Sequence, residues 1–328
     1  MFSFKSLDSD LAKSLSCPGA PTFIEVQLED LTESPFTDGE SWNPTACVLP
    51  AKYQQFADKV RNFEVYEDDV WIITFPKCGT TWTQEMVWLV DHDLDYSTAK
   101  RVNLNRRSVY LEIGCIAHNL PVDSLANAAN LPRPRHIKSH LPLALLPKQL
   151  WTVKPKLVYV SRNPKDVAVS YLHHYQMIMG YRGSKENFLE GLLTDKIVYC
   201  PQISHALDFW RLHNEQNVLF LTYEQMKRDL RTVLERVCGF FGKQYTNEQL
   251  DELVYHLSFD QMKKNPATNN VDMVAGAMQM NGRAGEKFKF MRKGEIGDHK
   301  TELSAETIAN FDKFIERELI GSDFRFDQ

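Results

Sequence analysis

The sequence predicts an α/β fold, a single domain with a central parallel sheet flanked by helices. Two observations carry this prediction. Three short runs are apolar throughout rather than alternating, as expected for strands that are buried on both faces of a sheet. Each run is followed by apolar residues at helical spacing. The 328 residues are 43% hydrophobic and 25% charged, which suffices for the core of one large domain.

The first 50 residues are predicted to be an irregular segment, because Cys17-Pro18 and Trp42-Asn43-Pro44 are turn signals. The remainder, 51–328, is predicted to be the folded domain. Its first strand is predicted at 70–74, where the residues are apolar or β-branched. Apolar residues at helical spacing between 82 and 90 predict the helix that follows.

Two further strands follow the same pattern. One is predicted at 157–160, and Asn163 and Pro164 then provide an N-cap and a first-turn proline for a helix running toward His174. The next is predicted at 218–223, followed by a helix to about residue 241. These strand–helix pairs predict that the strands are parallel.

Later elements show weaker signals. Thr246 and Gln249 form a predicted capping box, and apolar residues between 308 and 319 predict an amphipathic helix. Residues 266–289 are rich in Asn, Gly and Met, and we expect them to form a mobile lid.

Composition argues against several classes of protein. A net charge of −5 gives no general attraction to nucleic acid or to an anionic membrane. The six cysteines form no C-x-x-C pair and no histidine lies at ligand spacing, so neither a metal site nor a disulfide framework is predicted. No apolar run reaches about 18 residues and the N-terminus does not resemble a signal peptide, which predicts a cytoplasmic location.

The segment Phe75–Trp82 has the features of an anion-binding loop. It joins the first predicted strand to its helix, and a helix N-terminus presents unpaired N–H groups to a phosphate. Gly79 allows close approach, the hydroxyls of Thr80 and Thr81 can donate, and Lys77 adds charge. The loop lacks the G-x-x-x-x-G-K-[ST] pattern of nucleotide triphosphatases. The alternative interpretation is a turn capped by threonines.

A second anion site is predicted at the end of the second strand. Arg162 lies where this strand ends, and Ser170 shares a helix face with Asp166. Alone, such an arginine more often forms a surface ion pair. Because both candidate sites follow parallel strands, one ligand with two anionic groups and an adenosine between them is the simplest interpretation.

Four segments resemble motifs of the cytosolic sulfotransferases, in the family's order and from about residue 50 onward. Pro76–Trp82 resembles their P-K-S-G-T-T-W loop, and Lys138–Pro142 their K-T-H-L-P element. Tyr159–Tyr171 resembles their 3′-phosphate segment, and Phe290–Asp298 their R-K-G-x-x-G-D motif.

This resemblance implies transfer of a sulfuryl group from 3′-phosphoadenosine 5′-phosphosulfate (PAPS), leaving adenosine 3′,5′-bisphosphate (PAP). It assigns the nucleotide to three groups of residues. The loop Lys77, Cys78, Gly79, Thr80, Thr81 and Trp82 would hold the 5′-phosphosulfate, with Trp82 stacked on adenine; Arg162, Ser170, Phe290, Met291, Arg292, Lys293 and Gly294 would surround the 3′-phosphate; Tyr223, Ser258, Phe259 and Met262 would line the nucleoside.

The resemblance also implies catalytic roles. Lys77 would stabilise the leaving oxygens and Lys138 the transferring group, while His140 would be the general base. Ser170 would restrain premature hydrolysis through the catalytic lysine. A lone histidine is more often structural, but His140 lies two residues from Lys138, a spacing that puts both on one side of an extended segment. No metal is required for this chemistry.

The acceptor is predicted to be a small, hydrophobic phenol or alcohol. By resemblance, Tyr110, Ile113, His174 and Met177 would line its pocket together with Lys138 and His140. Three alternatives stay open: a catalytically silent PAP binder, a variant in which sulfation is followed by elimination, and a small-molecule kinase.

The chain departs from the family pattern at several positions. Cys78 replaces the usual serine, His299 replaces a tryptophan, and Leu257 stands where many relatives have a hydroxyl. The family's dimer motif should begin at Lys300, but Ser304-Ala305 replaces its Thr-Val pair. The sequence therefore leaves a homodimer open.

Overall fold

Two β-sheets organise the chain in the computed structural model, which describes residues 1–29, 34–36, 41–118, 120–286 and 290–327. The larger sheet is parallel throughout and has the strand order β5-β6-β4-β7-β8. Its strands are β4 (Val70–Thr74), β5 (Ser108–Tyr110), β6 (His136–Ser139), β7 (Lys156–Ser161) and β8 (Val218–Thr222). The predicted central parallel sheet is confirmed.

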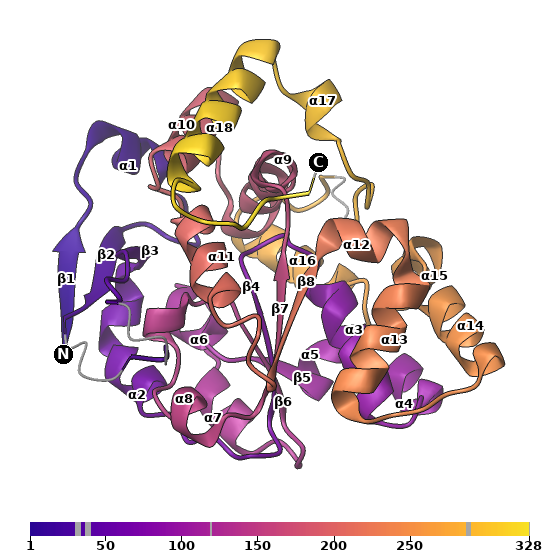
Figure 1. The fold of residues 1–328 in the computed structure, drawn as a ribbon. Helices are drawn as coiled ribbons and strands as arrows, with labels where there is room; N and C mark the ends of the chain where they lie inside the picture. The colour runs from indigo at the N-terminus through magenta and orange to yellow at the C-terminus, as the bar shows by residue number, and fades with distance from the viewer. Residues whose placement is uncertain (30–33, 37–40, 119, 287–289, 328) are drawn as a thin grey trace.

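Residues of β4 alternate between two hydrophobic cores, one on each face of the sheet. Val70 and Ile72 pack in the core that includes α3 (Thr80–Asp91) and α13 (Leu230–Phe241). Trp71 and Ile73 pack in the core that includes α11 (Gln202–Trp210). Both faces are therefore covered by helices (Figure 1), which explains why the sequence of the strand is apolar at every position but the last.

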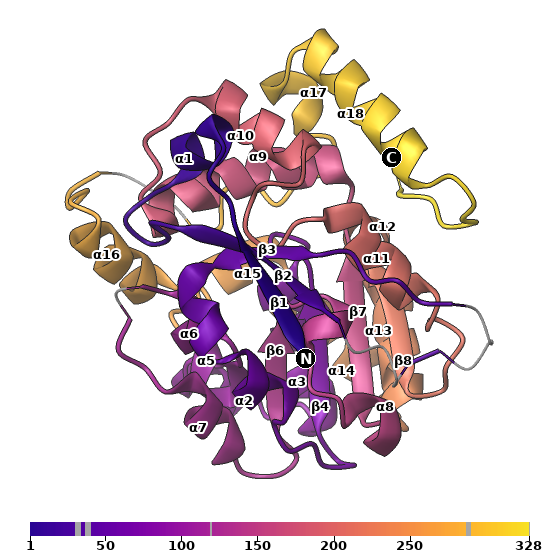
Figure 2. The same ribbon diagram turned by 90° about the vertical axis from the view of Figure 1, so that its left-hand side faces the viewer.

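The first 50 residues contain a second sheet, so the prediction of an irregular segment is wrong. The strands β1 (Phe2–Ser6), β2 (Phe23–Leu28) and β3 (Cys47–Pro50) pair antiparallel in that order, beside the main sheet (Figure 2). In β2 the apolar residues at 24, 26 and 28 are buried and alternate with polar ones, the pattern of a half-buried strand. The helix α1 (Asp10–Leu15) lies between β1 and β2.

Main-chain hydrogen bonds join this N-terminal sheet to the rest of the molecule. The N–H of Val48 donates to the carbonyl of Cys200 at 3.0 Å, and the N–H of Tyr199 donates to the carbonyl of Val48 at 2.7 Å. The sheet thus supports the segment that leads into α11.

Most predicted helices are confirmed. The helix α9 (Pro164–His174) begins at Asn163, whose side chain accepts from the N–H of Lys165. The capping box of Thr246 and Gln249 begins α14 (Asn247–His256), and α18 (Ala305–Glu318) is the predicted amphipathic helix.

The helix predicted after β8 is two helices. The helix α12 (Tyr223–Arg228) ends at Asp229, and the carboxylate of Asp229 then caps α13 by accepting from the N–H of Thr232. Within the predicted lid 266–289, α16 (Val271–Met280) forms, while residues 287–289 lie outside the described residues.

The remaining elements are short. They are η1 (Ala51–Gln55), α2 (Ala57–Arg61), α4 (Tyr96–Arg101), α5 (Leu104–Arg107), α6 (Ile113–Ile116), α7 (Ser124–Ala129), η2 (Leu143–Leu145), α8 (Leu150–Val153), the π-helical η3 (Tyr175–Met179), α10 (Lys185–Leu193), α15 (Phe259–Lys264) and α17 (His299–Glu302). Within the described part of the chain, we find no helix with the length and apolarity needed to cross a membrane.

Candidate active site

The loop between β4 and α3 leaves a helix N-terminus open to a ligand. Gly79 precedes the helix with φ 96°, and no side chain in the described part of the chain caps the first turn. A Cβ at Gly79 would lie 2.8 Å from the ring of Tyr223, so only glycine fits this close approach. Lys77 also has a positive φ of 70°, which is strained for a residue with a side chain and is typical of functional loops. The unpaired N–H groups at the start of α3 can therefore donate hydrogen bonds to a bound anion.

Within this loop, Thr80 turns inward and Cys78 is buried. The hydroxyl of Thr80 lies 2.7 Å from that of Thr74 at the end of β4. The thiol of Cys78 lies 3.9 Å from the carbonyl of Pro76, and burial raises its pKa. The residue is 1% exposed, and its backbone N–H donates to the carbonyl of Phe75 at 3.4 Å, so its thiol packs inside the loop.

Three cations gather at this loop, namely Lys77, Lys138 and Arg162. Burial, followed by the charges of Arg162 and Lys138, lowers the pKa of Lys77 to about 7. Burial lowers the pKa of Lys138 to about 8, although Glu112 opposes the shift. Among the described residues, neither lysine nor Arg162 forms an ion pair with a carboxylate. Such a cluster is stabilised by a bound anion.

Arg162 is held by hydrogen bonds to two carbonyl groups, and its Nε–H is available to a ligand. Its guanidinium donates to the carbonyl of Lys77 at 3.1 Å and to that of Glu295 at 3.0 Å, and lies 4.0 Å from the ring centroid of Tyr223. Its Nε is buried and has no hydrogen-bond partner among the described residues. A buried orphan donor beside the open helix end fits a phosphate oxygen.

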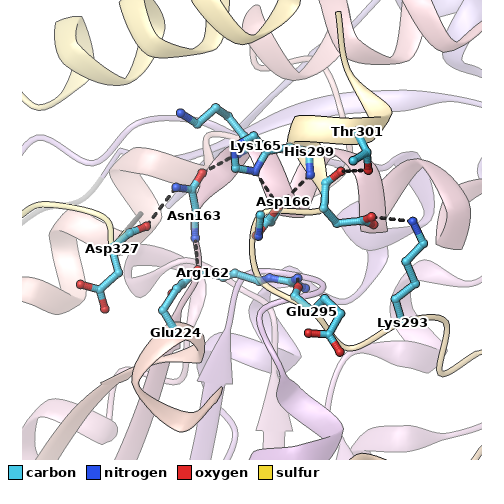
Figure 3. Close-up of polar contacts among 12 residues, drawn as sticks. Arg162, Asn163, Lys165, Asp166, Glu224, Lys293, Glu295, His299, Thr301 and Asp327 are labelled. Carbon is cyan, nitrogen blue, oxygen red and sulfur yellow. Dashed lines mark hydrogen bonds and ion pairs between the residues drawn. The ribbon is translucent and has the colours of Figure 1, made fainter. Parts of the chain in front are cut away.

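The late motif is fastened to α9 by Asp166. This buried carboxylate accepts from the N–H of Gly297 at 2.7 Å and of His299 at 3.1 Å, and pairs with Nδ1 of His299 at 2.6 Å (Figure 3). His299, where the family usually has tryptophan, therefore ties the motif to the helix that follows Arg162.

Arg292 and Lys293 are not free in this arrangement. Arg292 pairs with Asp298, and Lys293 lies 2.6 Å from Asp298 and 2.8 Å from Glu302. To hold a phosphate, both cations would exchange these carboxylates for it.

The residues predicted around the nucleoside fall into two groups. The rings of Trp82 and Tyr223 lie 5.8 Å apart at 69°, and Phe259 packs against Gly294, where a Cβ would clash with its ring. Ser258, by contrast, caps α15 by accepting from the N–H of Gln261, and Met262 is buried. Ser170 lies part-buried on α9 and makes no side-chain hydrogen bond among the described residues.

His140 is held as a neutral base. Its Nδ1 lies 2.7 Å from the carbonyl of Thr74, so this nitrogen carries the hydrogen and Nε2 presents a lone pair. Burial, followed by the charge of Lys138, lowers the pKa of His140 well below its usual value. The arrangement suits proton abstraction at neutral pH.

Three residues that position His140 were not predicted. Glu112 accepts from the N–H of His140 at 2.7 Å and from the hydroxyl of Tyr199 at 3.2 Å. Nε2 of His205 lies 3.2 Å from the carbonyl of His140, so it donates there. These partners are 28 to 65 residues from His140 in sequence, and their own sequence context carries no signal.

Of the predicted acceptor residues, Tyr110 lies against Lys138 and His140. Its ring is 5.1 Å from that of His140, Nζ of Lys138 lies 4.4 Å from its centroid, and its hydroxyl bonds that of Tyr199. Ile113 follows Glu112 at the start of α6.

His174 also lies near the cluster of cations at the anion loop, since burial, followed by the charge of Lys77, lowers its pKa well below the usual value. The rings of His174 and Phe290 are 6.3 Å apart, Nζ of Lys77 is 4.9 Å from the Phe290 centroid, and Met177 packs with Met278. Beyond Phe290 is a largely apolar cavity of about 530 Å³. It is lined by Lys263, Asn269, Val271, Val274, Ala275, Met278, Gln279, Ala284, Gly285, Glu286, Phe290 and Met291.

Residues 67–323 match the family model described as the sulfotransferase domain. The chain belongs to the sulfotransferase family. Its relatives include luciferin sulfotransferase of Photinus pyralis, 37% identical over 84% of this chain and 78% of the relative. Sulfotransferase 1A1 of Mus musculus is 34% identical over 84% of this chain and 92% of the relative.

Among solved structures, this sulfotransferase is similar to retinol dehydratase in complex with retinol and PAP. The TM-score is 0.85 at 26% identity, and the likeness covers 99% of each chain. The coverage includes the N-terminal sheet, which lies before the matched family domain.

Proposed function

We propose that this sulfotransferase transfers the sulfuryl group of PAPS to a hydroxyl of a small hydrophobic phenol or alcohol, with His140 as general base. The observation that carries the proposal is the cluster of Lys77, Lys138 and Arg162 around the uncapped N-terminus of α3. These cations have no carboxylate partner among the described residues, and the family supplies the reaction class.

The residues present fit a doubly anionic nucleotide. The loop from Lys77 to Trp82 would hold the 5′-phosphosulfate, and Arg162 with its orphan Nε the 3′-phosphate, joined by Ser170. Arg292 and Lys293 would join them after leaving Asp298 and Glu302. Trp82, Tyr223 and Phe259 offer rings for the base.

PAPS would supply an activated sulfuryl group. Side chains of the protein would stabilise the developing negative charge and remove the proton of the acceptor. Lys77 and Lys138 stabilise negative charge on the reacting oxygens in a partly buried site where such charges act strongly. Nε2 of His140 takes the acceptor proton, and the carbonyl of Thr74 stabilises the resulting imidazolium through Nδ1–H. A base of this kind contributes roughly 10²–10⁴-fold.

The direct test is calorimetric binding of PAP without metal. Wild-type protein should bind PAP, and Arg162→Ala should weaken binding by more than about tenfold because it removes a charge-assisted contact. Arg101→Ala, an exposed arginine in α4, is the matched control and should bind like wild type. Absence of PAP binding to folded wild-type protein would overturn the proposal.

A second assay separates binding from chemistry. With PAPS and a panel of phenols and alcohols, wild type should form sulfate esters, and His140→Ala should lose about 10²-fold or more in kcat while keeping PAP affinity. A protein that binds PAP but sulfates no acceptor would be the silent binder. The kinase alternative finds no support, since the matched domain is a sulfotransferase domain.

Elimination after sulfation is a second candidate function, favoured by the likeness to retinol dehydratase over 99% of each chain. An allylic alcohol distinguishes the two outcomes. Simple transfer accumulates the sulfate ester, whereas elimination breaks the ester C–O bond, loses a proton from carbon, and releases a diene and inorganic sulfate. Mass spectrometry of the product identifies which occurs.

The helix α16 and the cavity beyond Phe290 support a role for 266–289 as a lid over the acceptor. The exposed apolar residues Val271, Met273 and Met280 on α16 accord with a segment that closes on a hydrophobic ligand. A cytoplasmic location and a homodimer stay predictions.

A further inference from the structure

A cluster of metal-binding side chains lies at the end of the sheet opposite the candidate active site. Asp91 and His92 come at the C-terminus of α3, and His136 is the first residue of β6. Each offers one ligand atom, and these atoms lie within 4.8 Å of one another. Asp91 and His136 are 45 residues apart in the sequence, so no ligand spacing reveals the cluster.

His92 is oriented as a metal ligand. Its Nδ1 lies 3.0 Å from the carbonyl of Trp88, which accepts its hydrogen and leaves the Nε2 lone pair free. Its ring stacks on that of Trp88, with centroids 4.2 Å apart at 15°. A second ring nitrogen that donates to a backbone carbonyl is the arrangement that fixes metal-bound histidines.

His136 contributes a buried ring with an unsatisfied nitrogen. It is 1% exposed, its ring centroid lies 5.1 Å from that of His92, and its Nδ1 has no partner among the described residues. Its Nε2 lies 2.8 Å from a carboxylate oxygen of Asp91, so the ring faces the other two side chains of the cluster.

Asp91 would supply the anionic ligand, and it lies where an ion can enter from solvent. The carboxylate side chain of Asp91 is 16% exposed, whereas the ring of His136 is 1% exposed. Asp91 and His92 are part-exposed, so an ion and a completing water can reach the site from solvent. The nearby cation Arg107 is neutralised by Glu85 at 2.6 Å.

We propose that Asp91, His92 and His136 bind a divalent transition-metal ion, Zn²⁺ or a similar cation, with water as the remaining ligand. Two imidazoles and a carboxylate suit zinc and leave an open position. The ion would join the C-terminus of α3 to the start of β6. The anion loop lies at the other end of α3, and the Lys138–His140 segment lies at the other end of β6. The ion would therefore stabilise the positions of both elements without taking part in the reaction.

Titration of the metal-free full chain with Zn²⁺ and Co²⁺ tests this inference. Calorimetry should show one Zn²⁺ bound per chain, and Co²⁺ should develop the strong visible absorption of a four-coordinate ion. His92→Ala and Asp91→Asn should each weaken binding by more than about tenfold. Both residues are part-exposed, so these variants should stay folded, as circular dichroism would verify.

His213→Ala is a matched control. His213 also stacks on a tryptophan, Trp210, with centroids 3.9 Å apart at 7°, and its Nδ1 bonds that residue's carbonyl. Among the described residues, however, it belongs to no group of three metal-binding side chains. Its variant should bind Zn²⁺ like wild type. No stoichiometric binding, or binding that His213→Ala weakens as much as His92→Ala, would overturn the inference.

Discussion

At the scale of single residues, Lys77 has the most unusual environment in the candidate site. It combines a left-handed backbone, burial and two neighbouring cations, and its pKa is lowered to about 7. Burial and the neighbouring cations disfavour the charged form of Lys77 in the free protein, and a bound anion would offset both effects. The protonation of Lys77 should therefore report on the proposed binding of the nucleotide.

We predict that PAP binding takes up a proton near neutral pH. In the free protein Lys77 is about half protonated at pH 7, and in the complex the phosphates raise its pKa, so the complex holds more protons. PAP affinity should accordingly fall as pH rises through 7. Calorimetry in buffers of different ionisation enthalpy measures the uptake.

Lys77→Arg provides the control for this prediction, because arginine stays charged at all these pH values. It should remove the share of proton uptake due to Lys77 and leave only that of Lys138, whose pKa is about 8. Equal uptake in wild type and variant would contradict the assignment to Lys77.

At the scale of elements, the segment after β6 is held from both sides. The N–H of His140 bonds Glu112, its carbonyl bonds His205, and Tyr199 completes the contact to Glu112. Burial raises the pKa of Glu112 to about 7, and its Oε2 has no partner within the described chain. Keeping such a group in the core is costly unless it positions something.

We predict that Glu112→Ala lowers kcat by roughly 10²-fold, because a displacement of about 1 Å in the base costs that much. Glu112→Gln keeps an acceptor oxygen for the N–H of His140 and should stay within about threefold of wild type. PAP affinity should change much less than kcat in both, since the side-chain hydrogen bonds of Glu112 within the described residues go to His140 and Tyr199 and not to the anion loop, although its charge acts on Lys138. A parallel loss of PAP affinity and thermal stability in Glu112→Ala would indicate a purely structural role.

The sequence predicted some elements better than others, for physical reasons. The strands β4, β7 and β8 are apolar on both faces, so short runs of residues identify them. The strand β2 also has a signal, since Ile24, Val26 and Leu28 alternate with polar residues, but the turn signals around it predicted irregular structure. In β2 the alternation of apolar and polar residues identifies the strand, whereas the nearby prolines do not interrupt it.

The candidate site was predicted where its chemistry lies in contiguous motifs and not elsewhere. The loop at Lys77 and the strand end at Arg162 were predicted from local pattern alone. Glu112, His205 and the pairing of Arg292 with Asp298 depend on how distant or oppositely charged groups meet after folding. A single sequence does not show which of these side chains come into contact in the folded protein.

At the scale of the whole molecule, the proposed nucleotide site joins three segments that are distant in sequence. These are the loop after β4, the start of α9, and the late motif that Asp166 holds against α9. A ligand that binds only when all three are assembled stabilises the folded state against the unfolded chain.

We therefore predict that PAP at about 100 times its Kd adds about 2.7 kcal/mol to the free energy of unfolding and raises Tm by roughly 4 °C. Asp166→Asn should reduce the shift, because it weakens the contact to His299 and frees the late motif, without touching the anion loop. Arg101→Ala should show the full shift. Differential scanning calorimetry measures all three proteins. If Asp166→Asn keeps the full shift, the late motif contributes nothing to binding, and the nucleotide is held by the loop and Arg162 alone.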